Sequence, residues 1–75
     1  MQQSVPPRDA ETRLIELSHD LRTPLAIVVG FTELLLARDD TLTPEQRHDY
    51  IERTRAAAAD MRAILDAERA QRPPS

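Results

Sequence analysis

Two stretches of apolar residues, spaced three and four apart, run through most of this 75-residue chain. That spacing is the period of a helix with one apolar face, so the pattern predicts an all-α fold. The first stretch comprises Leu14, Leu17, Leu21, Leu25, Val28, Phe31 or Thr32, and Leu35. The second comprises Tyr50, Ile51, Thr54, Ala57, Ala58, Met61, Ile64 and Leu65.

A short segment of turn residues separates the two patterns. Asp39, Asp40 and Thr41 are poor helix formers and interrupt the first pattern. The second pattern opens with a Thr-x-x-Gln capping box that begins at Thr43, and Pro44 suits the first helical position.

These signals set the expected boundaries. We predict a first helix at about 11–38, a loop at 39–43 and a second helix at about 44–70. Residues 11–70 then form the domain. Paired prolines near both ends of the chain predict a flexible arm at 1–10 and a flexible tail at 71–75.

Two long helices joined by a short loop should form an antiparallel hairpin. The hairpin alone leaves part of each apolar stripe in water. The free energy gained by burying the stripes roughly balances the conformational entropy lost in so small a unit. We therefore expect the hairpin to form a homodimer, a four-helix bundle in which the second copy buries the rest.

The composition excludes several classes of function. The net charge of −3, with every basic residue an arginine, gives no excess of positive charge for binding nucleic acid. The chain has no cysteine and one glycine, so thiol chemistry and a glycine-rich phosphate loop are excluded, and nothing suggests a metal site. The most apolar stretch, 25–37, is shorter than the ~20 residues that span a bilayer, and no signal peptide is present. We expect a cytoplasmic protein without a membrane segment.

One segment, from Ser18 to Leu25, carries unusual chemistry. On a helical projection of 100° per residue with His19 at zero, the leucines of the first apolar stripe and Val28 fall between about 160° and 240°. His19 therefore points away from the predicted core. Four further residues share the outward side: Thr23, Ile27, Gly30 and Leu34. Exposed aliphatic side chains in a row indicate a contact surface.

His19 and its neighbour Asp20 could act together. A neutral imidazole is a nucleophile near neutral pH, and a carboxylate can hold its other nitrogen in the required tautomer. Successive helical residues diverge by about 100°, so this contact needs a particular pair of rotamers. Pro24 removes the N–H that would bond to the Asp20 carbonyl, which predicts a kinked helix.

Simpler interpretations exist for each of these residues. A single surface histidine is usually only solvated, Asp20 alone is a surface charge, and Gly30 could simply permit close packing. Thr23 and Pro24 could instead begin a new helix, although the apolar stripe continues in register across them. A second pair, His48 and Asp49, lacks the Thr-Pro continuation and is interpreted as solvated.

The combination is more specific than its parts. The run Ser-His-Asp-Leu-Arg-Thr-Pro-Leu at 18–25, followed by Ala26-Ile27-Val28, Gly30-Phe31 and Leu34-Leu35, closely resembles the H-box of sensor histidine kinases. In those kinases the box lies in the dimerisation and histidine-phosphotransfer domain. The resemblance covers about 11–67.

The resemblance implies a role for each matching residue. It makes His19 the phosphoacceptor, which takes the γ-phosphoryl group of ATP and passes it to an aspartate of a response regulator's receiver domain. It makes Asp20 the residue that orients and activates His19, and Thr23 a residue that could position water for dephosphorylating the regulator. Regulator contacts would fall on Ile27, Gly30, Phe31 and Leu34, with a second contact near 47–55.

Nothing in the chain matches the nucleotide-binding boxes of a complete kinase. No cofactor is therefore expected on this chain, and ATP and Mg²⁺ would come through a separate catalytic domain. We expect a piece of a longer kinase that is not an enzyme by itself, and this piece could be the cytosolic part of a membrane-bound sensor kinase. The alternatives are a stand-alone phosphotransfer or adaptor hairpin that binds a receiver domain without chemistry, and a plain oligomerisation hairpin.

Overall fold

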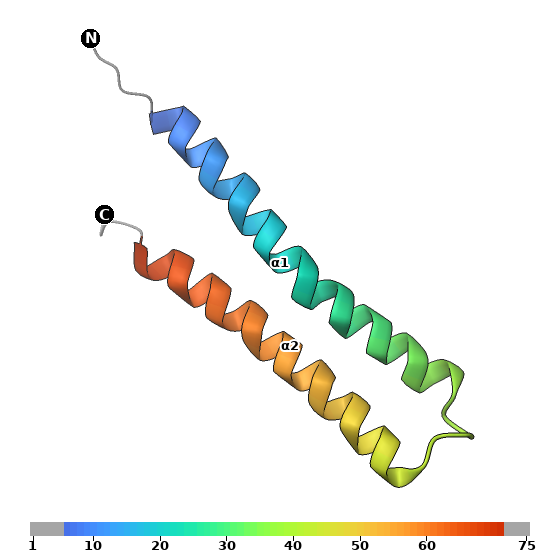
Figure 1. Ribbon diagram of the computed structural model, residues 1–75. Helices are drawn as coiled ribbons and strands as arrows, with labels where there is room; N and C mark the ends of the chain where they lie inside the picture. Colours follow the sequence, from blue (N-terminus) through green and yellow to red (C-terminus); the bar gives the residue numbers. More distant parts are fainter. Residues whose placement is uncertain (1–5, 72–75) are drawn as a thin grey trace.

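The computed structural model describes the backbone of residues 6–71 and the side chains of residues 10–70. Two helices account for nearly all of it: α1 (Pro6–Ala37) and α2 (Pro44–Gln71). They run antiparallel, with the start of α1 and the end of α2 at one end and the loop at the other (Figure 1). The predicted all-α hairpin is confirmed.

Helix α1 begins earlier than predicted. Its first residue is Pro6, whereas the sequence pattern placed the start at about 11. A proline fits the first turn because the N–H that it lacks would have no partner there, so Pro6 and Pro7 start a helix where we expected an arm. Helix α2 extends to Gln71, and the rest of the predicted arm and tail, 1–5 and 72–75, lies outside the described residues.

Helix α1 continues without interruption through Pro24. The alternative in which a new helix begins at Thr23 is therefore wrong. The predicted kink at Pro24 stays a prediction.

At the loop end of α1, one backbone carbonyl group accepts three hydrogen bonds. The Arg38 carbonyl accepts hydrogen bonds from the Thr41 N–H at 2.9 Å, the Leu42 N–H at 3.1 Å and the Thr41 hydroxyl at 3.0 Å. Carbonyls at a helix C-terminus have no partner inside the helix, so these donors satisfy an otherwise open acceptor.

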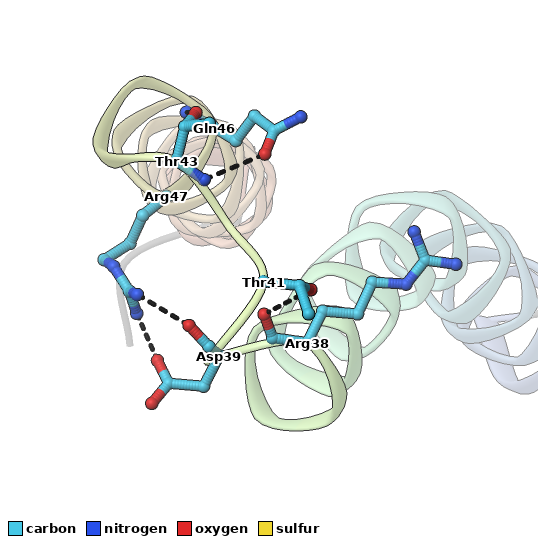
Figure 2. A network of polar contacts seen from close by, with 6 residues as sticks. All are labelled: Arg38, Asp39, Thr41, Thr43, Gln46 and Arg47. Carbon is cyan, nitrogen blue, oxygen red and sulfur yellow. Dashed lines mark hydrogen bonds and ion pairs between the residues drawn. The ribbon is translucent and has the colours of Figure 1, made fainter.

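The predicted capping box is present at the start of α2 (Figure 2). The Gln46 N–H donates to Thr43 Oγ1 at 3.0 Å, and the Thr43 N–H donates to Gln46 Oε1 at 2.9 Å. One turn further on, the Arg47 guanidinium pairs with the Asp39 carboxylate and donates to the Asp39 carbonyl at 2.8 Å. The loop is thereby fastened to α2 by both side chains and backbone.

Two contacts between the helices define their register. Arg13 Nη2 lies 3.2 Å from Glu68 Oε2, and the rings of Phe31 and Tyr50 lie 5.2 Å apart, centroid to centroid. The residue numbers of each pair add up to 81. The same sum places Pro24 opposite Ala57, and these are the two buried residues among the described side chains.

Burial within one chain is limited, and several large apolar side chains stay exposed. The most exposed are Leu36 at 84%, Ile15 at 68% and Leu14 at 63%. Leu25 was expected in the stripe that faces the second helix, yet 47% of it is exposed. Pro24 is buried and Phe31 contacts Tyr50, at about 140° and 120° on the projection, so the face of α1 that contacts α2 is turned toward these two residues and away from Leu25.

Candidate functional site

His19 lies in the middle of α1 with its side chain exposed, on the side away from α2, as the projection predicts. A shallow hollow surrounds it, lined by Leu14, Ile15, Ser18 and Arg22. The imidazole is thus accessible from solvent, and aliphatic side chains flank it on the preceding turn. An external group can therefore reach the imidazole ring of His19 without any movement of the hairpin.

Asp20 is also exposed, but it belongs to a different hollow. Among the residues with described side chains, the structure gives no hydrogen bond between Asp20 and His19. Asp20 instead lines a hollow together with Asp60 and Ile64 of α2. The two side chains leave the helix about 100° apart, which explains the separation. His19 and Asp20 are thus adjacent in the sequence, but no hydrogen bond links their described side chains.

Thr23 lines the same hollow as Asp20 and lies about one helical turn further along α1, toward the loop. Its side chain is exposed. The part of α1 that carries described side chains shows no hydrogen bond from the Thr23 hydroxyl to a backbone carbonyl, whereas Thr32 donates to Val28 and Val29 carbonyls at 2.8 and 2.9 Å. The Thr23 hydroxyl is thus available to an incoming group. Asp60 and Ala63 of α2 also reach this hollow, and sequence reasoning missed them because their place depends on the register.

The four predicted contact residues meet in one groove. Ile27, Gly30, Phe31 and Leu34 line it together with Ala26, Glu33 and Ala37. The groove has a volume of about 570 Å³ and runs along α1 toward the loop. Its lining is almost entirely apolar, so it can accept apolar side chains from another molecule.

Three of these four residues are less exposed than expected. Gly30, Phe31 and Leu34 are half-buried, whereas Ile27 is 40% exposed. Phe31 was expected both in the apolar stripe and, by the resemblance, among the regulator contacts; it packs against Tyr50, with an angle of 51° between the rings. The tilted arrangement suits the quadrupoles of two aromatic rings. Phe31 therefore serves the hairpin on one side and the groove on the other.

A cation borders the groove on the side of α2. The Arg53 guanidinium carbon lies 6.0 Å from the centre of the Phe31 ring, and Arg53 Nε donates to Asp49 Oδ2 at 2.9 Å. This arrangement falls within the second contact region expected at 47–55. His48, next to Asp49, is exposed and shares no hydrogen bond with it in the described part of the chain.

No group of three or more His, Cys, Asp or Glu side chains within residues 10–70 could hold a metal ion. Neither of the described helices is long and apolar enough to cross a membrane. The described part of α1 thus presents an exposed imidazole and, further toward the loop, an apolar groove.

Comparison with protein families identifies this arrangement. The model of the His Kinase A (phospho-acceptor) domain matches residues 14–69. The chain belongs to this family. It is thus a phospho-acceptor domain of the histidine kinases that serve two-component signal transduction, and the resemblance of residues 18–25 to the H-box is confirmed at the level of the family.

Individual relatives agree with the family. The phospho-acceptor domain is 43% identical over 53 residues to the signal transduction histidine-protein kinase BarA of Escherichia coli (strain K12), a match that covers 71% of this chain and 5% of that kinase. It is 33% identical over 54 residues to the hybrid signal transduction histidine kinase L of Dictyostelium discoideum, which covers 72% of this chain and 3% of that protein. The chain thus spans about a twentieth or less of these relatives. No solved structure gives a significant match.

Proposed function

We propose that this phospho-acceptor domain takes a phosphoryl group on His19 from ATP and relays it to an aspartate of a response-regulator receiver domain. The observation that carries the proposal is the exposed His19 above an apolar groove, within a run of residues that matches the family. ATP and Mg²⁺ would be held by a separate catalytic domain, because this chain has one glycine and no described cluster of metal ligands.

The first step is an in-line displacement at the γ-phosphorus. The neutral His19 Nε2 attacks, an N–P bond forms, and the bond from phosphorus to the β,γ-bridging oxygen breaks, so that ADP leaves. The positive charge that develops on the imidazole calls for a base or an anion near Nδ1. Asp20 is the nearest carboxylate in sequence, and a change of rotamer would bring it to His19.

In the second step, His19 gives up the phosphoryl group to the receiver domain. A carboxylate oxygen of the receiver attacks the phosphorus, the N–P bond breaks, and His19 returns to its neutral form. The groove formed by Ile27, Gly30, Phe31 and Leu34 lies on the same helix and would hold the receiver during this step. Thr23, between His19 and the groove, would position water for the removal of phosphate from the regulator.

The exposed apolar side chains support a homodimer. Leu14, Leu25, Val29 and Leu36 of α1 lie about 90° from the face that contacts α2, and Ile51 and Leu65 of α2 lie about 90° from the face that contacts α1, in the same rotational sense. Because the two helices are antiparallel, a rotation in the same sense along each chain puts the exposed apolar residues of α1 and those of α2 on one side of the hairpin. We call this side the apolar side. A second copy that packed against it would complete a four-helix bundle.

Phosphorylation tests the proposal directly. A purified histidine-kinase catalytic domain with ATP and Mg²⁺ should label the chain with acid-labile phosphate, and His19→Gln should abolish the label. The matched control is His48→Gln, which removes the other histidine that precedes an aspartate. An unlabelled wild-type chain, or a label that persists in His19→Gln, contradicts the proposal. A labelled chain that binds receiver domains but passes no phosphate to them supports the adaptor alternative instead.

A further inference from the structure

Asp60 of α2 lies almost directly across the hairpin from Asp20 of α1. The register between the helices places Asp20 opposite Met61, the neighbour of Asp60. Both aspartates are exposed, and both line one hollow of about 450 Å³. The two carboxylates therefore border the same volume of solvent, beside the helical turn that carries His19.

The lining of this hollow carries no positive charge that would offset the two carboxylates. Its other members within residues 10–70 are Thr23, Pro24, Ile27, Ala63 and Ile64. The ion pairs between described side chains involve neither Asp20 nor Asp60. Arg13, which lines the adjoining hollow with Asp20, is paired with Glu68. The charges of Asp20 and Asp60 thus repel each other across the gap between the helices.

The repulsion from Asp60 acts on Asp20 in a defined direction. On the projection of α1 with His19 at zero, Asp20 lies at about 100° and Pro24, which faces α2, at about 140°. A carboxylate that turns away from α2 therefore turns toward His19. Glu16, which lines the adjoining hollow, is displaced from Asp20 mainly along the helix axis, so its repulsion favours neither direction of rotation.

The hollow stays open in the proposed dimer. On the projection of α2, Asp60 lies about 60° from the buried Ala57, in the sense opposite to Ile51 and Leu65 of the apolar side. A second copy that packs against the apolar side thus covers neither Asp20 nor Asp60.

The proposed phosphorylation needs Asp20 in its other rotamer. The Nδ1–H of His19 would donate to the Asp20 carboxylate while Nε2 attacks the γ-phosphorus. The N–P bond forms, the bond from phosphorus to the β,γ-bridging oxygen breaks, and ADP leaves. A charge that destabilises the observed arrangement of Asp20 therefore raises the fraction of chains that are ready to react.

We propose that Asp60 is a positioning residue, whose negative charge turns the Asp20 carboxylate toward His19. This inference rests on the proposed function. Asp60 acts only through Asp20 and has no contact with the reacting atoms. Two unit charges on packed helices, roughly 9 Å apart, repel each other enough in solvent-exposed surroundings to change a population about two- to fivefold.

Substitutions of Asp60 and Asp20 test the inference. Asp60→Asn removes the charge at nearly constant size, Asp60→Glu keeps the charge, and Asp60→Asn is repeated in the Asp20→Asn background. The matched control is Asp66→Asn, which changes the net charge equally at an exposed position on the outer side of α2. A purified histidine-kinase catalytic domain with saturating Mg²⁺ and radiolabelled ATP phosphorylates each chain. Initial rates are measured against chain concentration at low and high salt, and circular dichroism verifies the helical content.

The expected results distinguish positioning from a structural role. Asp60→Asn should lower kcat about two- to fivefold and leave KM unchanged, because it alters the orientation of Asp20. The loss should shrink as salt rises from about 0.01 M to about 0.5 M, since the repulsion is then screened. Asp60→Glu should keep most of the wild-type rate, and Asp66→Asn should match the wild type. In the Asp20→Asn background, Asp60→Asn should have no further effect.

Other outcomes overturn the inference in distinguishable ways. A kcat of Asp60→Asn that equals or exceeds that of the wild type removes Asp60 from positioning and leaves the phosphorylation of His19 intact. A loss confined to KM, or an equal loss in the Asp20→Asn background, shows that Asp60 acts without Asp20. A wild-type chain that takes up no acid-labile phosphate contradicts the proposed function itself, and the inference with it.

Discussion

Pro24 of α1 and Ala57 of α2 lie opposite each other in the register of the hairpin, and both are buried. Ala57 is 3% exposed, and its small side chain leaves room for the proline ring. This buried pair lies five residues further along α1 than His19, on the side of the loop.

The first prediction concerns this contact. Ala57→Leu should lower the free energy of unfolding by about 1–3 kcal/mol, because the larger side chain meets Pro24 where no space is left. Ala59→Leu, on the outer side of α2, should change it little. Thermal unfolding at a fixed chain concentration measures both. An Ala57→Leu variant as stable as the wild type would show that the helices do not meet tightly there.

The capping box gives the second prediction. Thr43→Ala should cost about 1 kcal/mol of stability, since it removes the acceptor of the Gln46 N–H. Thr43→Ser keeps the hydroxyl and should restore most of this loss. Thr41→Ala is the matched control, because the Arg38 carbonyl retains two N–H donors when the Thr41 hydroxyl is lost. Equal losses for Thr41→Ala and Thr43→Ala in denaturant unfolding would refute the specific role of the box.

The third prediction concerns the ion pair between Arg13 and Glu68 at the open end of the hairpin. The Arg13 side chain is 42% exposed and that of Glu68 is 22% exposed, so the pair is partly screened by water. A double-mutant cycle with alanine at both positions should give a coupling energy of about 0.2–1 kcal/mol that decreases with added salt. A coupling that does not change with salt would argue against an electrostatic origin.

A pair of substitutions on opposite sides of α1 tests the proposed dimer. Val29 and Ile27 are 45% and 40% exposed, but Val29 belongs to the apolar side and Ile27 to the groove. We predict that Val29→Glu dissociates the dimer in sedimentation, since it would bury a charge between the copies. Ile27→Glu should sediment like the wild type. The reverse pattern, or a stably folded wild-type monomer at micromolar concentration, would contradict the four-helix arrangement.

The two helices, their antiparallel pairing and the capping box could be predicted from the sequence, because apolar periodicity, a short loop and capping residues are all visible in it. The orientation of Phe31 could not be predicted in the same way. A stripe of apolar residues fixes the face of a helix only approximately, and the contact between Phe31 and Tyr50 depends on the register between the helices. The start of α1 was also missed, since Pro6 and Pro7 fit a loop as well as a first helical turn.

The candidate site, too, could be predicted only in part from the sequence. The exposed position of His19 followed from the projection, and the four contact residues met in one groove. The pairing of His19 with Asp20 depends on rotamers, which the sequence pattern does not contain. Asp60 and Ala63 reach the hollow beside Thr23 from the other helix, so their place could be known only from the register.

The most direct test of the central claim is to locate the phosphoryl group in the labelled chain. Trypsin cleaves after arginine, so it separates the two histidines into the peptides Leu14–Arg22, with His19, and His48–Arg53. After labelling with ATP, Mg²⁺ and a histidine-kinase catalytic domain, mass spectrometry at alkaline pH should find one acid-labile phosphoryl group on Leu14–Arg22, at His19. A phosphoryl group on His48–Arg53, or an acid-stable one at Ser18, would contradict the account.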